Sequence, residues 1–294
     1  MREIVTKVPQ SWDGVMAKRF LRGYCGLSHH LLITLKAIPM GITMDGALLR
    51  TIDPVRAGCT VILRLPEDRS FPVPMPLPLR ILYEDADLLI VDKPPFMPVH
   101  PVHGHLNDTL ANAAAYYLES KGESCAFRPI YRLDRDTSGL IVAAKHTYAA
   151  SRLAGKIEKD YFAVVQGELR GTGRIDAPIR RKEGFGIQRE VGEEGVPSVT
   201  CWQALGFGKG HTFLRIKLET GRTHQIRVHF SYLQMPLAGD DMYGGSRQWI
   251  NRQALHCGNV HFFHPVTGKE MVLKCPFPED YLQLLDCCGI RADI

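Results

Sequence analysis

Two carboxylates and two arginines stand directly before a continuous apolar run in YRLDRDTSGLIVAAK, residues 131–145. Asp136 opens the turn-forming D-T-S-G, where its carboxylate can accept hydrogen bonds from the backbone N–H groups that follow, and this pattern predicts an Asx-turn. Asp134 lies just before that turn between Arg132 and Arg135, and neighbouring guanidinium groups favour an ionised carboxylate. Such a carboxylate can act as a nucleophile or as a general base, and the alternative for Asp134 is a surface salt bridge.

A second candidate is Arg227 in LETGRTHQIRVHF, residues 218–230. Gly221 ends the preceding strand pattern, and Thr223 can cap a helix. Arg227 then falls in or just after the first helical turn, where the helix dipole disfavours a cation. A cation in that position usually pairs with a nearby anion, and the alternative is a solvated arginine with its stem on the core.

The third candidate is Tyr161, which begins the strand pattern in EKDYFAVVQGE. Alternation places Tyr161, Ala163 and Val165 on one face of that strand. A tyrosine in this position is most often part of the core.

Four potential metal ligands gather toward the end of the chain: His256, Cys257, His261 and His264. Their spacing fits no common metal site. The pair Asp240-Asp241 in AGDDMYGG is better explained as a cap that shapes a glycine-rich loop. GFGKG lacks the spacing of a P-loop, and no G-x-G-x-x-G follows a predicted strand. The sequence therefore predicts no metal and no nucleotide cofactor.

Composition limits the class of protein. The chain has 294 residues, of which 45% are hydrophobic and 23% charged, as in a globular protein with an ample core. No apolar run is long enough to span a bilayer, and the first residues lack the apolar stretch of a signal peptide. The eight cysteines include no C-x-x-C pair, as expected for reduced thiols. We therefore expect a cytoplasmic monomer with no membrane partner.

Charge and proline divide the chain. Residues 1–65 contain nine Lys/Arg and four Asp/Glu, and therefore hold the whole net charge of +5, while the remainder contains 27 of each. A basic appendage on a neutral body suggests a module that binds a polyanion, with chance asymmetry as the alternative. Residues 66–80 carry five prolines and predict a stiff, extended connector. The predicted domains are thus 1–65 and 81–294.

The elements expected before the connector are two helices and a few strands. Residues 12–24 predict an amphipathic helix whose basic face carries Lys18, Arg19 and Arg22. Ser28 is the expected N-cap of a second helix. Asp45-Gly46 between apolar runs predicts a hairpin, and residues 59–65 predict a further strand.

Strands outnumber helices after the connector, and turn signals separate several strands directly. This pattern favours an α+β fold with a mixed, largely antiparallel sheet over a doubly wound parallel sheet. Helices are expected at 106–120, 148–158, 223–233 and 277–288. Strands are expected at 87–95, 139–145, 160–169, 198–206 and 211–220, with a strand pair or a bent strand at 254–265.

Five motifs occur together and in one order: RLDRDTSG before an apolar strand, KDYFAVVQG, GRTHQIRVH, PLAGDDMYGG and ALHCGNVHFFHP. This combination resembles the RluA-type RNA pseudouridine synthases over about residues 81–285. Residues 12–65 resemble the αL RNA-binding module of ribosomal proteins. The resemblance implies a pseudouridine synthase catalytic domain at 81–294 behind a small N-terminal α/β RNA-binding domain.

The resemblance also implies a role for each candidate. Asp134 matches the catalytic aspartate, and Arg227 matches the basic residue that pairs with it. Tyr161 matches the active-site tyrosine that stacks on the base. Arg132 matches the arginine that enters the space left by a flipped uridine, and Leu255 matches an apolar residue of the pocket.

The implied activity is isomerisation of specific uridines in RNA to pseudouridine, through cleavage of N1–C1′ and formation of C5–C1′. An aspartate at the sugar carbon can stabilise positive charge, attack C1′ or take a proton from C2′, and these alternatives remain open. We expect ribosomal RNA as substrate, with Lys18, Arg19 and Arg22 as RNA-binding residues. The alternatives are a tRNA-directed synthase and a catalytically inactive RNA-binding or ribosome-assembly factor.

Overall fold

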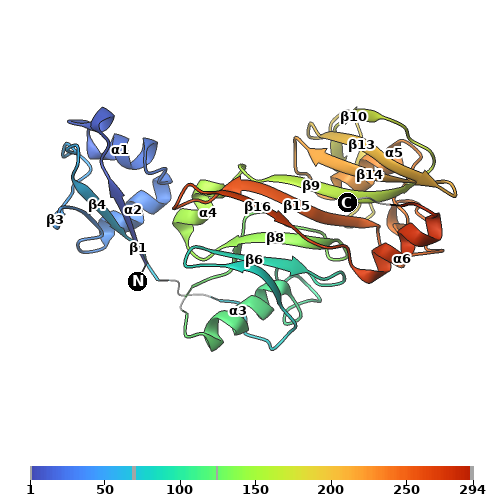
Figure 1. The fold of residues 1–294 in the computed structure, drawn as a ribbon, viewed down its shortest axis with the longest axis horizontal. Coiled ribbons are helices and arrows are strands. Elements are labelled where there is room, and N and C mark those ends of the chain that lie inside the picture. Colours follow the sequence, from blue (N-terminus) through green and yellow to red (C-terminus); the bar gives the residue numbers. More distant parts are fainter. Residues whose placement is uncertain (1, 68–70, 124, 292–294) are drawn as a thin grey trace.

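The computed structural model of the chain describes residues 2–67, 71–123 and 125–291. Residues 68–70 of the predicted connector and the last residues, 292–294, lie outside the described part. Figure 1 shows an elongated molecule, with a small unit from the start of the chain at one end and a large sheet that occupies the rest.

The small unit is an antiparallel sheet with two helices against it. Its strand order is β1 (Glu3–Lys7), β4 (Thr60–Arg64), β2 (Ile42–Met44), β3 (Ala47–Leu48). Its helices are α1 (Ala17–Gly23) and α2 (His29–Ala37), preceded by the 3₁₀ helix η1 (Gln10–Trp12). A separate hydrophobic core fills the space between sheet and helices, with Phe20, Leu35 and Val61 fully buried.

Local signals in this unit act as predicted. Ser28 caps α2 by accepting a hydrogen bond from the backbone N–H of Leu31 at 3.1 Å. Asp45 and Gly46 join β2 to β3 with φ of 49° and 84°, the positive values that a tight hairpin turn needs. The first helix is shorter than predicted and begins at Ala17, because Met16 is extended and forms a bridge with Pro54.

The large sheet has ten strands within the described residues, and it is mixed and mostly antiparallel, as predicted. Its strand order is β10 (Thr172–Asp176), β13 (Val199–Gly208), β14 (His211–Leu218), β9 (Glu158–Gln166), β15 (Leu255–Phe263), β8 (Ser138–Ala144), β6 (Leu88–Lys93), β5 (Arg80–Glu84). Off this path, β16 (Glu270–Lys274) pairs with β15 and β7 (Arg128–Pro129) pairs with β8. A separate hairpin consists of β11 (Ile179–Arg181) and β12 (Arg189–Val191).

The parallel pairing of β8 with β15 lies at the centre of the sheet. It is short, with Ser138 opposite His256 and Gly139 opposite Cys257. Because the pair is parallel, both strands start at the same edge of the sheet, and the loop before β8 lies near the first residue of β15. That edge is where the candidate site forms. β15 itself is one bent strand, with a register shift between Cys257 and Asn259.

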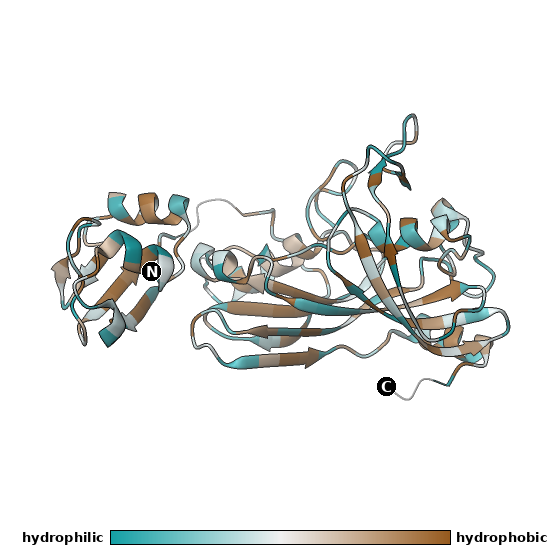
Figure 2. Cartoon of the chain, turned by 90° about the horizontal axis from the view of Figure 1, so that it is seen from above, coloured by the Kyte–Doolittle hydropathy of each residue, from teal (hydrophilic) through white to brown (hydrophobic). Residues whose placement is uncertain are grey.

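The sheet is buried on both faces, which the alternation in β9 shows. Tyr161, Ala163 and Val165 belong to the main core, together with residues of α3 (Leu110–Ser120), α4 (Thr147–Leu153) and α5 (Gln225–Tyr232). Phe162 and Val164 face the opposite side, where α6 (Glu279–Cys288) packs. Figure 2 shows the corresponding hydrophobic colouring along the strands.

The predicted connector, 66–80, has no regular structure in its described part except at Arg80, which begins β5, and its residues Val73 and Met75 contact α3. Asn112 of α3 donates a hydrogen bond to the carbonyl of Val73 at 2.7 Å, and its own carbonyl accepts from the N–H of Met75 at 3.2 Å. The small unit also contacts the large one directly, because Arg2 donates to the carboxylate of Asp87 at 2.9 and 3.1 Å. None of the helices in the described residues is both long and apolar enough to cross a membrane.

Candidate active site

A cleft lies at the edge of the sheet where β8 and β15 begin, and residues from five parts of the chain line it. The loop before β8, strands β9 and β14, the start of α5 and the start of β15 all contribute. Every catalytic and pocket residue predicted from the sequence lines this cleft: Arg132, Asp134, Tyr161, Arg227 and Leu255. A roomier cavity of about 430 Å³ between α5 and β12 shares no lining residue with it and holds none of them.

Asp134 occupies a turn that leads into β8. Its backbone carbonyl accepts a hydrogen bond from the N–H of Thr137 at 3.1 Å. The Asx-turn predicted for Asp136 is wrong: that carboxylate instead accepts from the guanidinium of Arg135 at 2.6 and 3.0 Å. The backbone hydrogen bond closes the turn without it. Arg135 is thus engaged with Asp136, and Asp134 is left with 26% of its side chain exposed in the cleft.

The guanidinium that contacts Asp134 comes from Arg227 on α5, 93 residues further along the chain. The Nη1 of Arg227 donates to Oδ2 of Asp134 at 3.2 Å, and the arginine side chain is only 6% exposed. Burial opposes the charge of Arg227, but hydrogen bonds and charge from Asp240 together with Asp134 raise its pKa above the ordinary arginine value. The cation is therefore permanent and faces Asp134.

Asp240 is the main partner of Arg227, and sequence reasoning missed it. Its two carboxylate oxygens accept from Nε and Nη2 of Arg227 at 2.7 and 2.8 Å, and its side chain is 1% exposed. The predicted capping role is wrong, because Asp240 precedes the 3₁₀ helix η2 (Asp241–Tyr243) without a side-chain cap bond. The isolated positive charge early in α5 was the signal that a buried anion was needed.

His224 is a second residue that the sequence did not single out. It precedes α5 in the left-handed conformation, with φ of 57°, so the helix begins after His224 and the predicted cap, Thr223, is not used. Its Nε2 lies 3.9 Å from Oδ2 of Asp134, and its Nδ1 lies 2.8 Å from the hydroxyl of Tyr243. Burial lowers the pKa of His224, and the nearby cation of Arg227 acts in the same direction, while Asp134 opposes the shift.

Tyr161 and Leu255 form the apolar wall of the cleft. Tyr161 is 6% exposed on β9, where it pairs with Ile216 of β14 and Cys257 of β15. It is therefore both a core residue and a cleft residue. Burial, with lesser contributions from Cys257 and Asp134, raises the pKa of Tyr161 well above its usual value, so its ring stays neutral. Leu255, 4% exposed, is the first residue of β15.

The basic residues occupy different places. Arg132 is exposed and lines the cleft, and within the described residues it has no ion-pair partner. Lys18, Arg19 and Arg22 are exposed on α1, which Figure 1 places at the opposite end of the molecule from α5. The structure therefore brings Arg132 to the cleft and does not bring the three α1 residues there.

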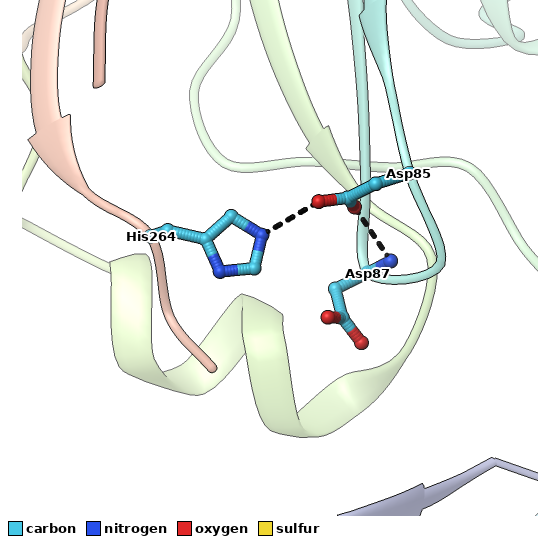
Figure 3. A group of neighbouring side chains, drawn as sticks. All are labelled: Asp85, Asp87 and His264. Carbon is cyan, nitrogen blue, oxygen red and sulfur yellow. Dashed lines mark hydrogen bonds and ion pairs between the residues drawn. The ribbon is translucent and has the colours of Figure 1, made fainter. Parts of the chain in front are cut away.

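One group of side chains has the composition of a metal site: Asp85, Asp87 and His264, drawn in Figure 3. Protein groups already occupy these atoms. Asp85 accepts from the backbone N–H groups of Asp87 and Leu88 and from Nε2–H of His264, and Asp87 accepts from Arg2. The group therefore joins turns of the large sheet to the small unit. The four potential metal ligands considered in the sequence do not form one site, as His256 contacts Ser138 and His264 contacts Asp85.

Comparison with known proteins shows the family of the chain. A family model described as RNA pseudouridylate synthase matches residues 87–232. An uncharacterized RNA pseudouridine synthase of Bacillus subtilis, YjbO, is 36% identical over 90% of this chain and 96% of its own length. The chain belongs to the RNA pseudouridylate synthase family. It is an enzyme that isomerises uridine in RNA, as the resemblance implied.

Further relatives and solved structures extend the comparison. The ribosomal large subunit pseudouridine synthase D of Pseudomonas aeruginosa is 38% identical over 83% of this chain and 82% of its own length. The structure of human RNA pseudouridylate synthase domain containing 1 superposes with a TM-score of 0.59 at 27% identity, covering 72% of this chain and 87% of that one. The structure of human RNA pseudouridylate synthase domain containing 4 superposes with a TM-score of 0.57 at 20% identity, covering 72% of this chain and 94% of that one, which supports the fold. The α+β prediction is confirmed.

Proposed function

We propose that this synthase converts specific uridines of large-subunit ribosomal RNA to pseudouridine in the cleft that holds Asp134. The reaction breaks N1–C1′, turns the uracil, joins C5 to C1′ and moves the C5 proton away while N1 takes up a proton. No atom is added, so the cleft needs no redox group. The observation that carries this proposal is that the Asp134 carboxylate is partly exposed in the cleft, while its partner Arg227 is buried and held by Asp240.

Asp134 acts on the ribose in this proposal. Glycosidic cleavage develops positive charge at the sugar, and a carboxylate at C1′ stabilises that charge in a site of low dielectric. Arg227 orients the carboxylate of Asp134 through its contact at 3.2 Å. Arg227 does not move with Asp134, because Asp240 holds the other side of its guanidinium with two bonds.

The remaining cleft residues handle the base. A stacked uridine must be flipped to reach Asp134, which costs about a few kcal/mol. Arg132 is exposed at the cleft and unpaired within the described residues, so it is free to occupy the gap that the uridine leaves. Tyr161 offers the detached uracil an aromatic face, worth roughly 1–3 kcal/mol. Leu255 excludes water from the same wall.

The unit formed by residues 1–65 is proposed to bind RNA beside the catalytic domain, 81–294. Its exposed basic residues on α1 and its separate core support this division. Ribosomal RNA is proposed as the substrate because the Pseudomonas relative is named for the large ribosomal subunit. Mapping pseudouridines in ribosomal and transfer RNA, in cells with and without the gene, tests this choice: sites lost only from tRNA would contradict it.

The decisive experiment on the site is Asp134→Asn, with Asp136→Asn as matched control. Both changes remove one carboxylate from the same loop, but only Asp134 faces Arg227. Asp134→Asn is expected to lower pseudouridine formation by several orders of magnitude and to leave RNA affinity nearly unchanged, while the control keeps most activity. An Asp134→Asn protein that still isomerises uridine, or two variants with equal losses, would refute the assignment. A wild-type protein that binds RNA but forms no pseudouridine would favour the alternative, a catalytically inactive RNA-binding or ribosome-assembly factor.

A further inference from the structure

His224 presents one nitrogen to the cleft, and the hydrogen bonds around it determine whether that nitrogen carries a proton. The hydroxyl oxygen of Tyr243 accepts from the backbone N–H of Arg189 at 3.0 Å and lies 2.8 Å from Nδ1 of His224. Within the described residues, the Tyr243 hydroxyl has no other hydrogen-bond partner. Its proton therefore goes to Nδ1, which accepts it, and a neutral imidazole then carries its own proton on Nε2.

The neutral state of His224 follows from its surroundings. The ring is nine-tenths buried, and its neighbours include two carboxylates and two guanidinium groups, from Asp134, Asp240, Arg189 and Arg227. Burial lowers the pKa of the imidazole, so the ring is uncharged at neutral pH. The Nε2–H group of His224, which faces Asp134, is thus a hydrogen-bond donor on an uncharged ring.

The distance between this donor and Asp134 leaves room for one atom. Nε2 of His224 lies 3.9 Å from Oδ2 of Asp134, which is too far for a direct hydrogen bond. An oxygen at about 2.8 Å from each of them fits between, because two such contacts together exceed the gap. The bridging oxygen must accept from His224 and donate to Asp134. A hydroxyl group does both, whereas a carbonyl oxygen cannot donate.

We propose that His224 and Asp134 together bind the 2′-hydroxyl of the target nucleotide, which makes His224 a specificity residue for ribose. The inference rests on the proposed function, because it needs Asp134 beside the sugar. C2′ is bonded to C1′, so a carboxylate at C1′ lies within reach of the 2′-oxygen. This hydroxyl is the group by which a protein distinguishes RNA from DNA at one position. The pair therefore aligns the sugar and rejects a deoxyribose in one contact.

The test compares two RNAs that differ only at the target position, one with uridine and one with 2′-deoxyuridine. Single-turnover kinetics give the half-saturating concentration of the uridine RNA, and competition gives the inhibition constant of the deoxyuridine RNA. For the wild type, the second value is expected to exceed the first by about tenfold, the effect of one hydrogen bond to a charged or buried partner. A wild type that binds both RNAs equally would overturn the proposal.

Variants at position 224 separate this role from a structural one. His224→Asn tolerates the left-handed backbone and can still reach Tyr243, but it is too short to place a donor where Nε2 lies. His224→Gln places an amide N–H further out, near that position. The tenfold difference is expected to vanish in His224→Asn and to return in part in His224→Gln. A difference that persists in His224→Asn would refute the role.

The tautomer has its own readout in the free enzyme. In ¹⁵N-histidine NMR spectra, His224 is expected to show a protonated Nε2 and an unprotonated Nδ1, and Tyr243→Phe is expected to lose this preference. A protonated Nδ1 in the wild type would overturn the proposal. Failure of the proposed function has a different signature, because Asp134→Asn would then still form pseudouridine whatever the behaviour of position 224.

Discussion

Arg227 and Asp240 form a buried pair through two parallel hydrogen bonds of 2.7 and 2.8 Å, whereas Arg227 reaches Asp134 through a single contact of 3.2 Å. Asp240 therefore fixes the position of the guanidinium, and the single contact to Asp134 is the weaker of the two interactions. A fixed cation of this kind needs no reorganisation when charge changes on the neighbouring carboxylate, which is the property expected of a preorganised site.

Asp240→Asn is expected to lower activity, although the Asp240 side chain itself does not contact the substrate. Removal of one partner from a buried ion pair costs about 3–5 kcal/mol, so both thermal stability and turnover should fall. The neighbouring Asp241→Asn is the control, because Asp241 is 57% exposed in its pair with Arg247 and should change stability by less than about 1 kcal/mol. Denaturant unfolding and single-turnover rates measure both. Equal behaviour of the two variants would contradict the anchoring role of Asp240.

Gly139→Ala is expected to break the central strand pairing. Gly139 has φ of 113°, and an added Cβ would lie 2.3 Å from the carbonyl oxygen and 2.7 Å from the backbone nitrogen of Cys257. Main-chain atoms cannot swing aside, so β8 and β15 must separate, at a cost above about 4 kcal/mol. Gly268→Ala is the control, since φ is 70° there with open space around it, and should cost about 1–2 kcal/mol. The soluble yield and melting temperature of each variant decide the matter.

Acid should destabilise the fold through His256. This ring is fully buried between Ser138 and the carbonyl of Cys275, and burial lowers its pKa to about 4. The unfolded chain binds the proton near pH 6.5 and the folded chain does not, so stability falls as pH drops from 6.5 to 4 and stays complete above 6.5. The loss is about 3 kcal/mol.

The measurement for His256 is the free energy of unfolding at several pH values for the wild type and for His256→Gln. The variant starts less stable at pH 7, but its curve should be flatter between pH 6.5 and 4 because the titrating group is gone. Parallel curves would show that His256 does not carry the acid sensitivity.

The three α1 residues should act through charge alone. Replacement of Lys18, Arg19 and Arg22 by alanine is expected to weaken RNA binding and to reduce the slope of log K against log salt by about 2, as phosphate contacts are lost. The turnover rate at saturating RNA should stay the same, because α1 lies at the opposite end of the molecule from α5, whose first residues line the cleft. Lys269 and Lys274, exposed on the β15–β16 hairpin, provide a control with equal loss of charge per residue. A control that weakens binding as much would contradict a specific role for α1.

Patterns that depend on near neighbours were predictable from the sequence. Alternation along β9 placed Tyr161 on the face of Ala163, and the side chain of Ser28 capped α2 as its type and position indicated. Short polar strands escaped prediction, as in β11 and β12, because three residues carry too little alternation to be distinguished from a loop. The prediction of an Asx-turn at Asp136 was wrong because the neighbouring Arg135 offered the carboxylate a charged partner.

By itself, the sequence determined the family, the mixed sheet and the five cleft residues, since these follow from motifs and from periodicity along continuous segments. Only the tertiary structure decided which anion holds Arg227, and that His224 stands 3.9 Å from Asp134. The physical reason is distance along the chain. Asp134 and Arg227 are 93 residues apart, and their meeting depends on the pairing of β8 with β15 and on the path of the loop that carries Asp240. The pattern of neighbouring residues along the sequence does not determine such a path.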